Sequence, residues 1–244
     1  MKELNPEFDG SVEYDCQGSK ITELKFPAEH VTNIDPISEF RNLRKLIFAA
    51  SEGHKSKITD LSALQGLPLE TLSCERSKID NLAPLKGMKL QALHCRWTQV
   101  SNLSPLQGMP LQNLQIGRAP VTDLAPLQGM KLTKLNCWGT KVGDISVLKG
   151  MPLQSLTCAE TSINDLAPLK GMRLTELACR KTKVTDLSPL KGIPLKKLNC
   201  DFVPERDTKI LRSIKTLEII NDLPVKEFWK RVEAGDVPSG RADE

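Results

Sequence analysis

The sequence predicts an α/β solenoid, in which short coils of chain stack and each adds one strand to a curved parallel sheet. Leucines recur 21 residues apart without a gap, at Leu69, Leu90, Leu111, Leu132, Leu153, Leu174 and Leu195. A fixed period of this length is typical of stacked repeats. The composition agrees, because 39% of the residues are apolar but only 4% are aromatic, which indicates a thin aliphatic core.

Each repeat is predicted to hold one strand and one tight return on the convex side. In a central copy, Leu156 and Cys158 are two residues apart, so on a strand both point to the same, inner face. Asp165 is placed to cap a turn, Pro168 fixes φ within it and Gly171 ends it. The return is too short for a long helix, so we expect 3₁₀ or irregular convex segments.

Both ends of the stack need a cover. Val12 to Asp15 and Lys20 to Lys25 are predicted to pair as a hairpin cap at the front, and the polar insert Ser51 to Lys57 is predicted to be a surface loop. At the back, the apolar spacing of Val225, Phe228, Trp229 and Val232 predicts a capping helix with Trp229 in its core. The predicted organisation is an N-terminal cap at 1–20, a solenoid at 21–219, a capping helix at 220–234 and a flexible tail at 235–244.

Six of the seven cysteines occupy one column of the repeat: Cys74, Cys95, Cys137, Cys158, Cys179 and Cys200. Neighbouring strands lie about 4.8 Å apart, a distance that a disulfide can span, but in-register strands send their Cβ vectors side by side. The paired spacing C-x₂-C of metal sites is missing. We therefore expect buried free thiols, with no metal and no cofactor.

The phrase L-x-x-L-x-[LC]-x-x-[NT]-x-[LI] resembles the strand signature of leucine-rich repeats, and its continuation D-[LI]-x-P-L is similar to the short, bacterial, internalin-like class. The resemblance covers Ile21 to Ile219. Many members have Asn where this chain has Thr98, Thr140, Thr161 and Thr182. Because a hydroxyl satisfies fewer backbone groups than an amide, we expect a less firmly held turn. The copy that begins at Leu111 has Ile116 and Ala119 in place of the Cys and Thr.

The closing segments, Pro204 to Ile214 and Glu227 to Lys230, resemble the end of the leucine-rich repeat domain attached to some bacterial serine/threonine kinases. The kinase signatures H-R-D and D-F-G are missing from this chain. Phosphoryl transfer needs those residues, so the resemblance does not bring kinase activity with it.

No catalytic constellation is recognisable, and we predict that the chain is not an enzyme. His30, His54 and His94 have no nucleophile and carboxylate at a recognisable spacing, and His94 is expected to be a surface histidine. Nucleotide-binding glycine motifs are also missing. No apolar run reaches the length of a signal peptide core or of a membrane span, so we expect no membrane insertion and a cytoplasmic location.

The third, fifth, seventh and eighth positions of each repeat are predicted to line the concave face, which the resemblance implies is the binding surface. Arginine and tryptophan gather at the seventh and eighth positions and dominate interface hot spots in general. Gly117 and Gly139, beside the tryptophans, are interpreted as leaving room for a partner or for a tilted indole. The predicted partner-binding residues are Arg76, Arg96, Trp97, Arg118, Trp138, Arg180 and Lys181.

The function predicted from these residues is a non-catalytic interaction module that binds a protein or peptide of acidic character. Two alternatives stay open: a structural spacer without a ligand, whose arginines simply stack on indoles, and a nucleic-acid binder. The second is disfavoured by the near balance of 34 Lys and Arg against 30 Asp and Glu, and by Glu75, Glu160 and Asp201 among the cations.

Overall fold

The computed structural model describes residues 1–51 and 53–238. The chain divides into two compact units, Met1–Met130 and Lys131–Glu244, and each is described by itself.

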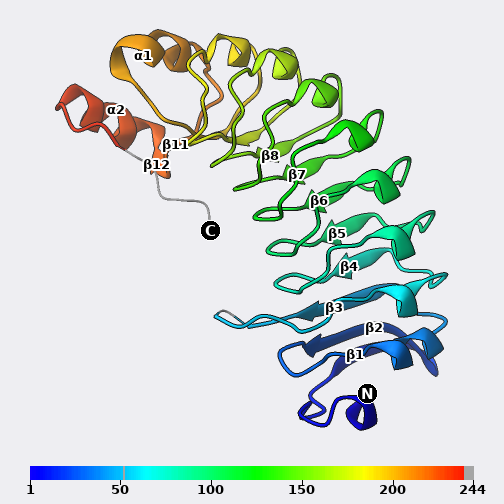
Figure 1. Cartoon of the computed structure of the whole chain (residues 1–244). Coiled ribbons are helices and arrows are strands. Elements are labelled where there is room, and N and C mark those ends of the chain that lie inside the picture. Colours follow the sequence, from blue (N-terminus) through cyan, green and yellow to red (C-terminus); the bar gives the residue numbers. More distant parts are fainter. Residues whose placement is uncertain (52, 239–244) are drawn as a thin grey trace. The chain divides into compact units, whose positions relative to one another are not determined.

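The first unit is a front hairpin followed by a ladder of parallel strands (Figure 1). Leu46, Leu72, Leu93 and Leu114 lie opposite one another in register, so the repeat leucines form one inward column. The strands are β1 (Glu13–Gln17), β2 (Lys20–Pro27), β3 (Lys45–Ala49), β4 (Thr71–Ser73), β5 (Ala92–His94) and β6 (Asn113–Gln115). The 3₁₀ helices are η1 (Lys2–Leu4), η2 (Asp35–Glu39), η3 (Ser62–Leu64), η4 (Ala83–Leu85), η5 (Ser104–Leu106) and η6 (Ala125–Leu127). The hairpin cap and the 3₁₀ returns are confirmed, and the described residues of the insert at 51–57 form no helix or strand.

The second unit continues the same repeat and then closes it with helices (Figure 1). Its strands are β7 (Lys134–Asn136), β8 (Ser155–Thr157), β9 (Glu176–Ala178), β10 (Lys197–Asn199), β11 (Ile219–Ile220) and β12 (Leu223–Pro224). Its helices are η7 (Ser146–Leu148), η8 (Ala167–Leu169), η9 (Ser188–Leu190), α1 (Pro204–Ser213) and α2 (Val225–Glu233). The predicted C-terminal helix is present as α2, but it begins at Val225 because the small hairpin of β11 and β12 occupies the residues before it.

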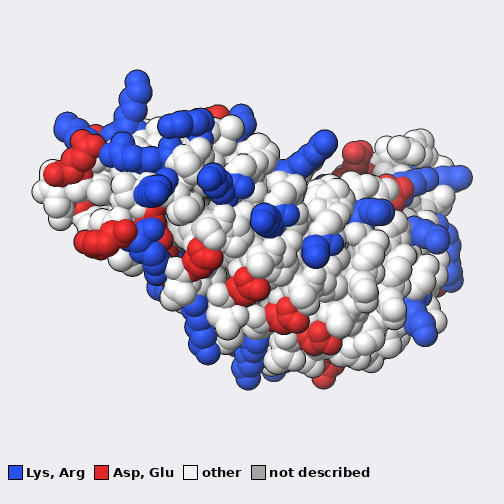
Figure 2. Space-filling view, turned by 90° about the horizontal axis from the view of Figure 1, so that it is seen from above, with Lys and Arg blue, Asp and Glu red and all other residues white. Residues whose placement is uncertain are grey.

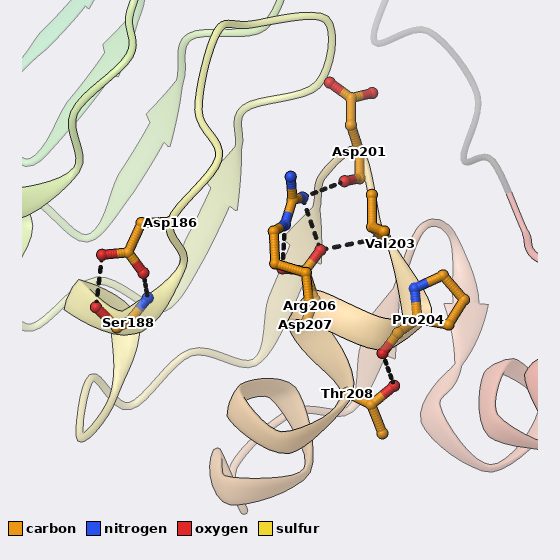
Figure 3. Close-up of polar contacts among 8 residues, drawn as sticks. All are labelled: Asp186, Ser188, Asp201, Val203, Pro204, Arg206, Asp207 and Thr208. Carbon is orange, nitrogen blue, oxygen red and sulfur yellow. Dashed lines mark hydrogen bonds and ion pairs between the residues drawn. The ribbon is translucent and has the colours of Figure 1, made fainter.

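Aspartate or asparagine holds the convex turns of the repeat. The Asp165 carboxylate accepts the Ala167 backbone N–H at 2.7 Å, and Gly171 ends the return with φ 75°. In the next coil, Asp186 accepts both the backbone N–H and the hydroxyl of Ser188, at 2.8 and 2.7 Å (Figure 3). These are Asx-type turns, which fix the return without a long helix.

The six column cysteines are buried free thiols, whereas Cys16 in β1 is exposed. Burial raises the pKa of Cys95, Cys137 and Cys179 to about 12. It also raises the pKa of Cys74, Cys158 and Cys200 well above the ordinary value. The column therefore behaves as small apolar core residues. Ile116, which replaces the cysteine in one copy, is equally buried.

The threonine column bonds within its own coil. The hydroxyls of Thr98, Thr140 and Thr161 each donate at 2.7 Å to the carbonyl of the column cysteine three residues earlier. Thr182 does the same at 2.8 Å. Each hydroxyl thus satisfies one carbonyl at the end of a strand, in line with its smaller hydrogen-bonding capacity.

The C-terminal cap is an aromatic cluster over the last coil. Phe202 lies 5.1 Å from Phe228 and 5.8 Å from Trp229, between ring centroids, and the Arg212 guanidinium lies 4.3 Å from the Trp229 ring. Trp229, predicted to lie in the core of the capping helix, packs in this cluster but is half-buried, and Phe228 is the buried residue of α2. Phe202 occupies the eighth position of its repeat and was therefore expected on the concave face. That expectation is wrong, because α2 covers Phe202 and leaves it 7% exposed.

A buried carboxylate fixes the first turn of α1 (Figure 3). Asp207 is 1% exposed, accepts the Val203 backbone N–H at 2.8 Å and accepts two bonds from Arg206 at 2.7 and 2.8 Å. Arg206 also donates to the Asp201 carbonyl at 3.0 Å. The bonds to Val203 and Asp201 tie α1 to the segment that follows β10, so the cap closes where the repeat stops.

The flexible tail predicted at 235–244 falls partly on residues 239–244, which lie outside the described residues. Just before them, Pro238 is buried and its carbonyl accepts a bond of 2.9 Å from the Asn221 amide. Across residues 1–51 and 53–238, no helix is long and apolar enough to cross a membrane.

Burial of the cysteine column predicts selective thiol reactivity. In the native protein, a thiol reagent such as dithionitrobenzoate should modify Cys16 rapidly and the six column cysteines much more slowly. Counting thiols released with time, before and after denaturation, measures this. A Cys16→Ser variant should lose the fast phase. Column cysteines that react as fast in native as in denatured protein would contradict the burial.

Candidate functional site

The eighth position of the repeat adopts a left-handed backbone in both units. In the first unit, the backbone N–H groups of Arg76 and Trp97 donate at 2.9 Å to the next coil, so the sheet ladder continues through this position. A left-handed backbone is costly for any residue with a Cβ, and more so for a bulky one. The φ values are 57° at Arg76, 61° at Trp97, 61° at Arg118, 64° at Gly139, 54° at Glu160 and 51° at Lys181.

Trp97 lies between two guanidinium groups in the first unit. The Arg76 guanidinium carbon is 5.3 Å from the Trp97 ring centroid, and that of Arg118 is 5.6 Å from it. Both distances suit cation–π contacts. Trp97 keeps 38% of its surface exposed, so the stacking does not bury it. The structure therefore brings together three predicted site residues, and the arginine stacking considered as an alternative is present as well. We call Arg76, Trp97 and Arg118 the Trp97 cluster.

Arg96 differs from the Trp97 cluster because its charge is compensated. Its guanidinium makes two bonds to the Glu75 carboxylate, at 2.7 and 3.0 Å, and this contact raises the Arg96 pKa. Arg76, by contrast, has no ion pair among the residues that the structure describes. The cationic character of this face therefore comes from the eighth position more than from the seventh.

Polar side chains at the third and fifth positions of β5 and β6 also face one another in the first unit. The His94 ring nitrogen Nε2 is 3.2 Å from the Asn113 amide nitrogen and 3.5 Å from that of Gln115. Burial lowers the pKa of His94. The neutral ring can accept a hydrogen bond from either amide. His94, which was expected to be a surface histidine, lies on β5 and is half-buried.

The second unit places its predicted residues differently. Trp138 is 5% exposed, so the exposure expected for it is wrong. The seventh position of the next coil holds the small, buried Ala159, which leaves room for the indole to lie against the coil. The backbone N–H of Trp138 donates to the Asn136 side chain at 3.0 Å.

Lys181 and Arg180 lie in a charge-compensated part of the second unit. The Lys181 ammonium is 2.7 Å from the Glu160 carboxylate, and its backbone N–H donates to Asp201 at 2.6 Å. Arg180 is half-buried. The structure thus keeps Lys181 exposed but supplies it with a carboxylate partner. Figure 2 shows that basic and acidic side chains are both present on the face it draws.

The repeat pattern did not predict the left-handed backbone at the eighth position. Gly139 was interpreted as room beside a tryptophan, but with φ 64° it occupies the position where the backbone favours glycine. A lone glycine in a column of long side chains was the available signal. Gly117 is buried at the seventh position and has no positive φ. Within the described residues, no group of three or more His, Cys, Asp or Glu side chains could hold a metal ion.

No family model and no curated protein matches the sequence. Its structure, however, is similar to that of internalin C2 from Listeria monocytogenes, with a TM-score of 0.67, 26% identity, and coverage of 74% of this chain and 80% of that one. In fold, this chain is an internalin-like leucine-rich repeat protein. A second Listeria monocytogenes internalin, InlF, has a TM-score of 0.54 at 20% identity, over 82% of this chain and 79% of that one.

Two further structures share the repeat fold. The functional domain of InlJ from Listeria monocytogenes, described as including a cysteine ladder, has a TM-score of 0.53 at 22% identity and covers 82% of this chain and 53% of that one. A plant ice-binding protein has a TM-score of 0.59 at 14% identity, over 96% and 88% of the two chains. At these identities, the two likenesses show a shared fold alone. The resemblance to kinase-attached repeats stays a prediction.

The left-handed backbone at Trp97 predicts an unusual order of stabilities. Trp97→Gly relieves the backbone strain that Trp97→Ala keeps, and both lose the same cation–π contacts. The glycine variant should therefore be more stable than the alanine variant by about 1 kcal/mol. Urea unfolding of both variants measures the difference. At Arg96, which has no positive φ, the order should reverse. Glycine less stable than alanine at position 97 would contradict the strain argument.

Proposed function

We propose that the chain is a non-catalytic interaction module and that the Trp97 cluster is the centre of its binding surface. The observation that carries the proposal is Trp97 itself: a bulky residue, 38% exposed, in a backbone conformation that glycine adopts more easily. Gly139 shows that the repeat accepts glycine at this position. Folding does not require a strained tryptophan at this exposed position. The backbone strain at Trp97 therefore supports a functional role for its side chain.

The chemistry of the cluster supports a protein or peptide partner of acidic character. A guanidinium that stacks by its face on an indole keeps its N–H groups at its edge, where they match a carboxylate in two parallel bonds. The guanidinium carbons of Arg76 and Arg118 lie 5.3 and 5.6 Å from the Trp97 ring centroid. An exposed tryptophan flanked by arginines also has the composition of an interface hot spot. We expect the partner to place carboxylates over the arginines and an apolar group against the indole.

The two alternative functions, a structural spacer and a nucleic-acid binder, require surface features that differ from those of an interaction module. A spacer needs no strained aromatic residue on its surface, so the left-handed backbone at Trp97 counts against it. Nucleic-acid binding needs a continuous positive surface. In the first unit, the ion pair of Arg96 with Glu75 reduces that potential, and in the second unit the ion pair of Lys181 with Glu160 does the same.

We also propose a cytoplasmic location. Cys16 is an exposed free thiol, and such thiols persist more readily in a reducing compartment. Fractionation of the source cells, with the protein detected by antibody, tests the location independently of binding.

A crosslinking pull-down from source lysate tests the proposed function. It compares the parent chain with an Arg76→Glu, Trp97→Gly variant and with a Lys86→Glu control, which carries the same charge reversal on an exposed turn. The glycine keeps the site variant folded, because it suits φ 61°. We expect a protein recovered by the parent and the control but lost by the site variant. Recovery by all three would move the site elsewhere, and recovery that nuclease treatment abolishes would favour nucleic acid.

A further inference from the structure

A small polar hollow in the front cap of the first unit is separate from the Trp97 cluster. It encloses about 270 Å³. The front hairpin contributes Gln17, Lys20 and Thr22, and the segment after η2 contributes Arg41, Asn42 and Arg44, with Pro68 completing the wall. Three cations and three neutral hydrogen-bonding side chains therefore converge on one space.

The charges around this hollow are not balanced. Arg44 forms an ion pair with Glu70. Lys20 and Arg41 form no ion pair among the residues that the structure describes. Neighbouring strand lysines do have carboxylates, since Lys25 pairs with Glu13 at 3.0 Å and Lys45 with Glu23 at 2.7 Å.

The size and charge of the hollow select the ligand. A drug-sized molecule needs roughly 300–1,000 Å³, so this hollow suits a single charged group. Two unpaired cations balance a dianion better than a carboxylate, and a phosphate monoester carries about −1.5 to −2 charges at pH 7. The Arg41 fork can donate two parallel bonds to phosphate oxygens, and Lys20 supplies a point charge.

We propose that this hollow binds a phosphate monoester group, held by Lys20 and Arg41 and oriented by the amides of Gln17 and Asn42. The hairpin turn and the segment after η2 supply these groups from two sides, so the oxyanion bridges the cap to the first parallel coil. The site does not depend on the function proposed for the Trp97 cluster. The group can come from free phosphate or from a phosphorylated peptide.

Calorimetric titration at constant ionic strength tests the site with inorganic phosphate, a phosphoserine peptide and the same peptide without phosphate. We expect saturable binding of phosphate by the parent, tighter at pH 7.5 than at pH 5.5, because the dianion predominates at the higher pH. Tighter binding of the phosphopeptide than of phosphate would assign the group to a peptide, and the reverse order would assign it to free phosphate. No binding of the unphosphorylated peptide is expected in either case.

Two double variants that lose the same positive charge test whether phosphate binds in the hollow. Lys20→Gln with Arg41→Gln should weaken phosphate binding at least tenfold, whereas Lys86→Gln with Lys89→Gln, on exposed residues elsewhere in the unit, should leave it within twofold. All four side chains are exposed, and circular dichroism checks that both variants stay folded. The proposal is overturned if the parent shows no saturable phosphate binding, or if both variants lose binding equally.

Discussion

Raising the pH above 9 should destabilise this protein strongly. Burial holds the pKa of Cys95, Cys137 and Cys179 at about 12, against an ordinary value of 9.0. Between these values the unfolded chain releases thiol protons that the folded chain keeps. Stability is therefore fully present below pH 9 and is lost as the pH rises toward 12. At pH 10, each such thiol should lower the free energy of unfolding by about 1 kcal/mol.

Urea unfolding at pH 7.5 and at pH 10, under reducing conditions, measures this loss. Other groups, lysine above all, also titrate in this range, so the matched comparison is between two cysteine variants. Cys137→Ala removes a buried thiol and should lose less stability between the two pH values than the parent does. Cys16→Ala removes the exposed thiol and should behave as the parent does. The same pH dependence in both variants would contradict the burial of the column.

Leu156→Ala should cost about 2–5 kcal/mol of unfolding free energy, through lost transfer energy and the cavity left behind. Leu156 is fully buried, and its neighbours in register are Leu135 and Leu177. A leucine layer lies on each side of it, so the coil cannot collapse easily into the space.

Leu24→Ala is the matched comparison at the front of the stack. Leu24 is 5% exposed and has the antiparallel hairpin strand, instead of another coil, on one side. Because contacts in a repeat stack are between nearest neighbours, this change should mainly fray the end. Urea unfolding of both variants, followed by far-ultraviolet circular dichroism, gives the two losses. Equal losses would contradict the nearest-neighbour account.

The regular part of the fold could be predicted because one physical constraint repeats. Leucine and cysteine two residues apart must share a strand face, and Asp, Pro and Gly at fixed offsets must make a turn. Both hold in most copies, although Ile116 replaces the cysteine in one, Asn81 and Asn102 replace the aspartate in two, and Val147 replaces the proline in another. The end of the chain has no such repetition. No clear period predicts α1 or the two-residue strands β11 and β12, whose formation depends on covering the last coil.

The candidate site was predictable in position but not in detail. The sequence places arginine and tryptophan at the seventh and eighth positions, and the structure keeps Trp97 exposed between two arginines. The sequence does not reveal that the seventh position can be buried, as at Trp138, because this burial depends on the small Ala159 in the next coil. Nor does it reveal that Arg96 bonds to Glu75 across a repeat. Such contacts join neighbouring coils, and periodicity alone does not specify them.

Site-specific photocrosslinking tests the central claim, that the Trp97 cluster binds a protein partner, most directly. A photoreactive phenylalanine derivative replaces Trp97 in one version of the chain and Lys86, on an exposed turn, in another. Both versions are irradiated in source lysate, and the adducts are identified by mass spectrometry. The account predicts a protein adduct, abolished by Arg76→Glu, from position 97 and not from position 86. Adducts from position 86 alone, or the same adducts from both positions, would contradict it.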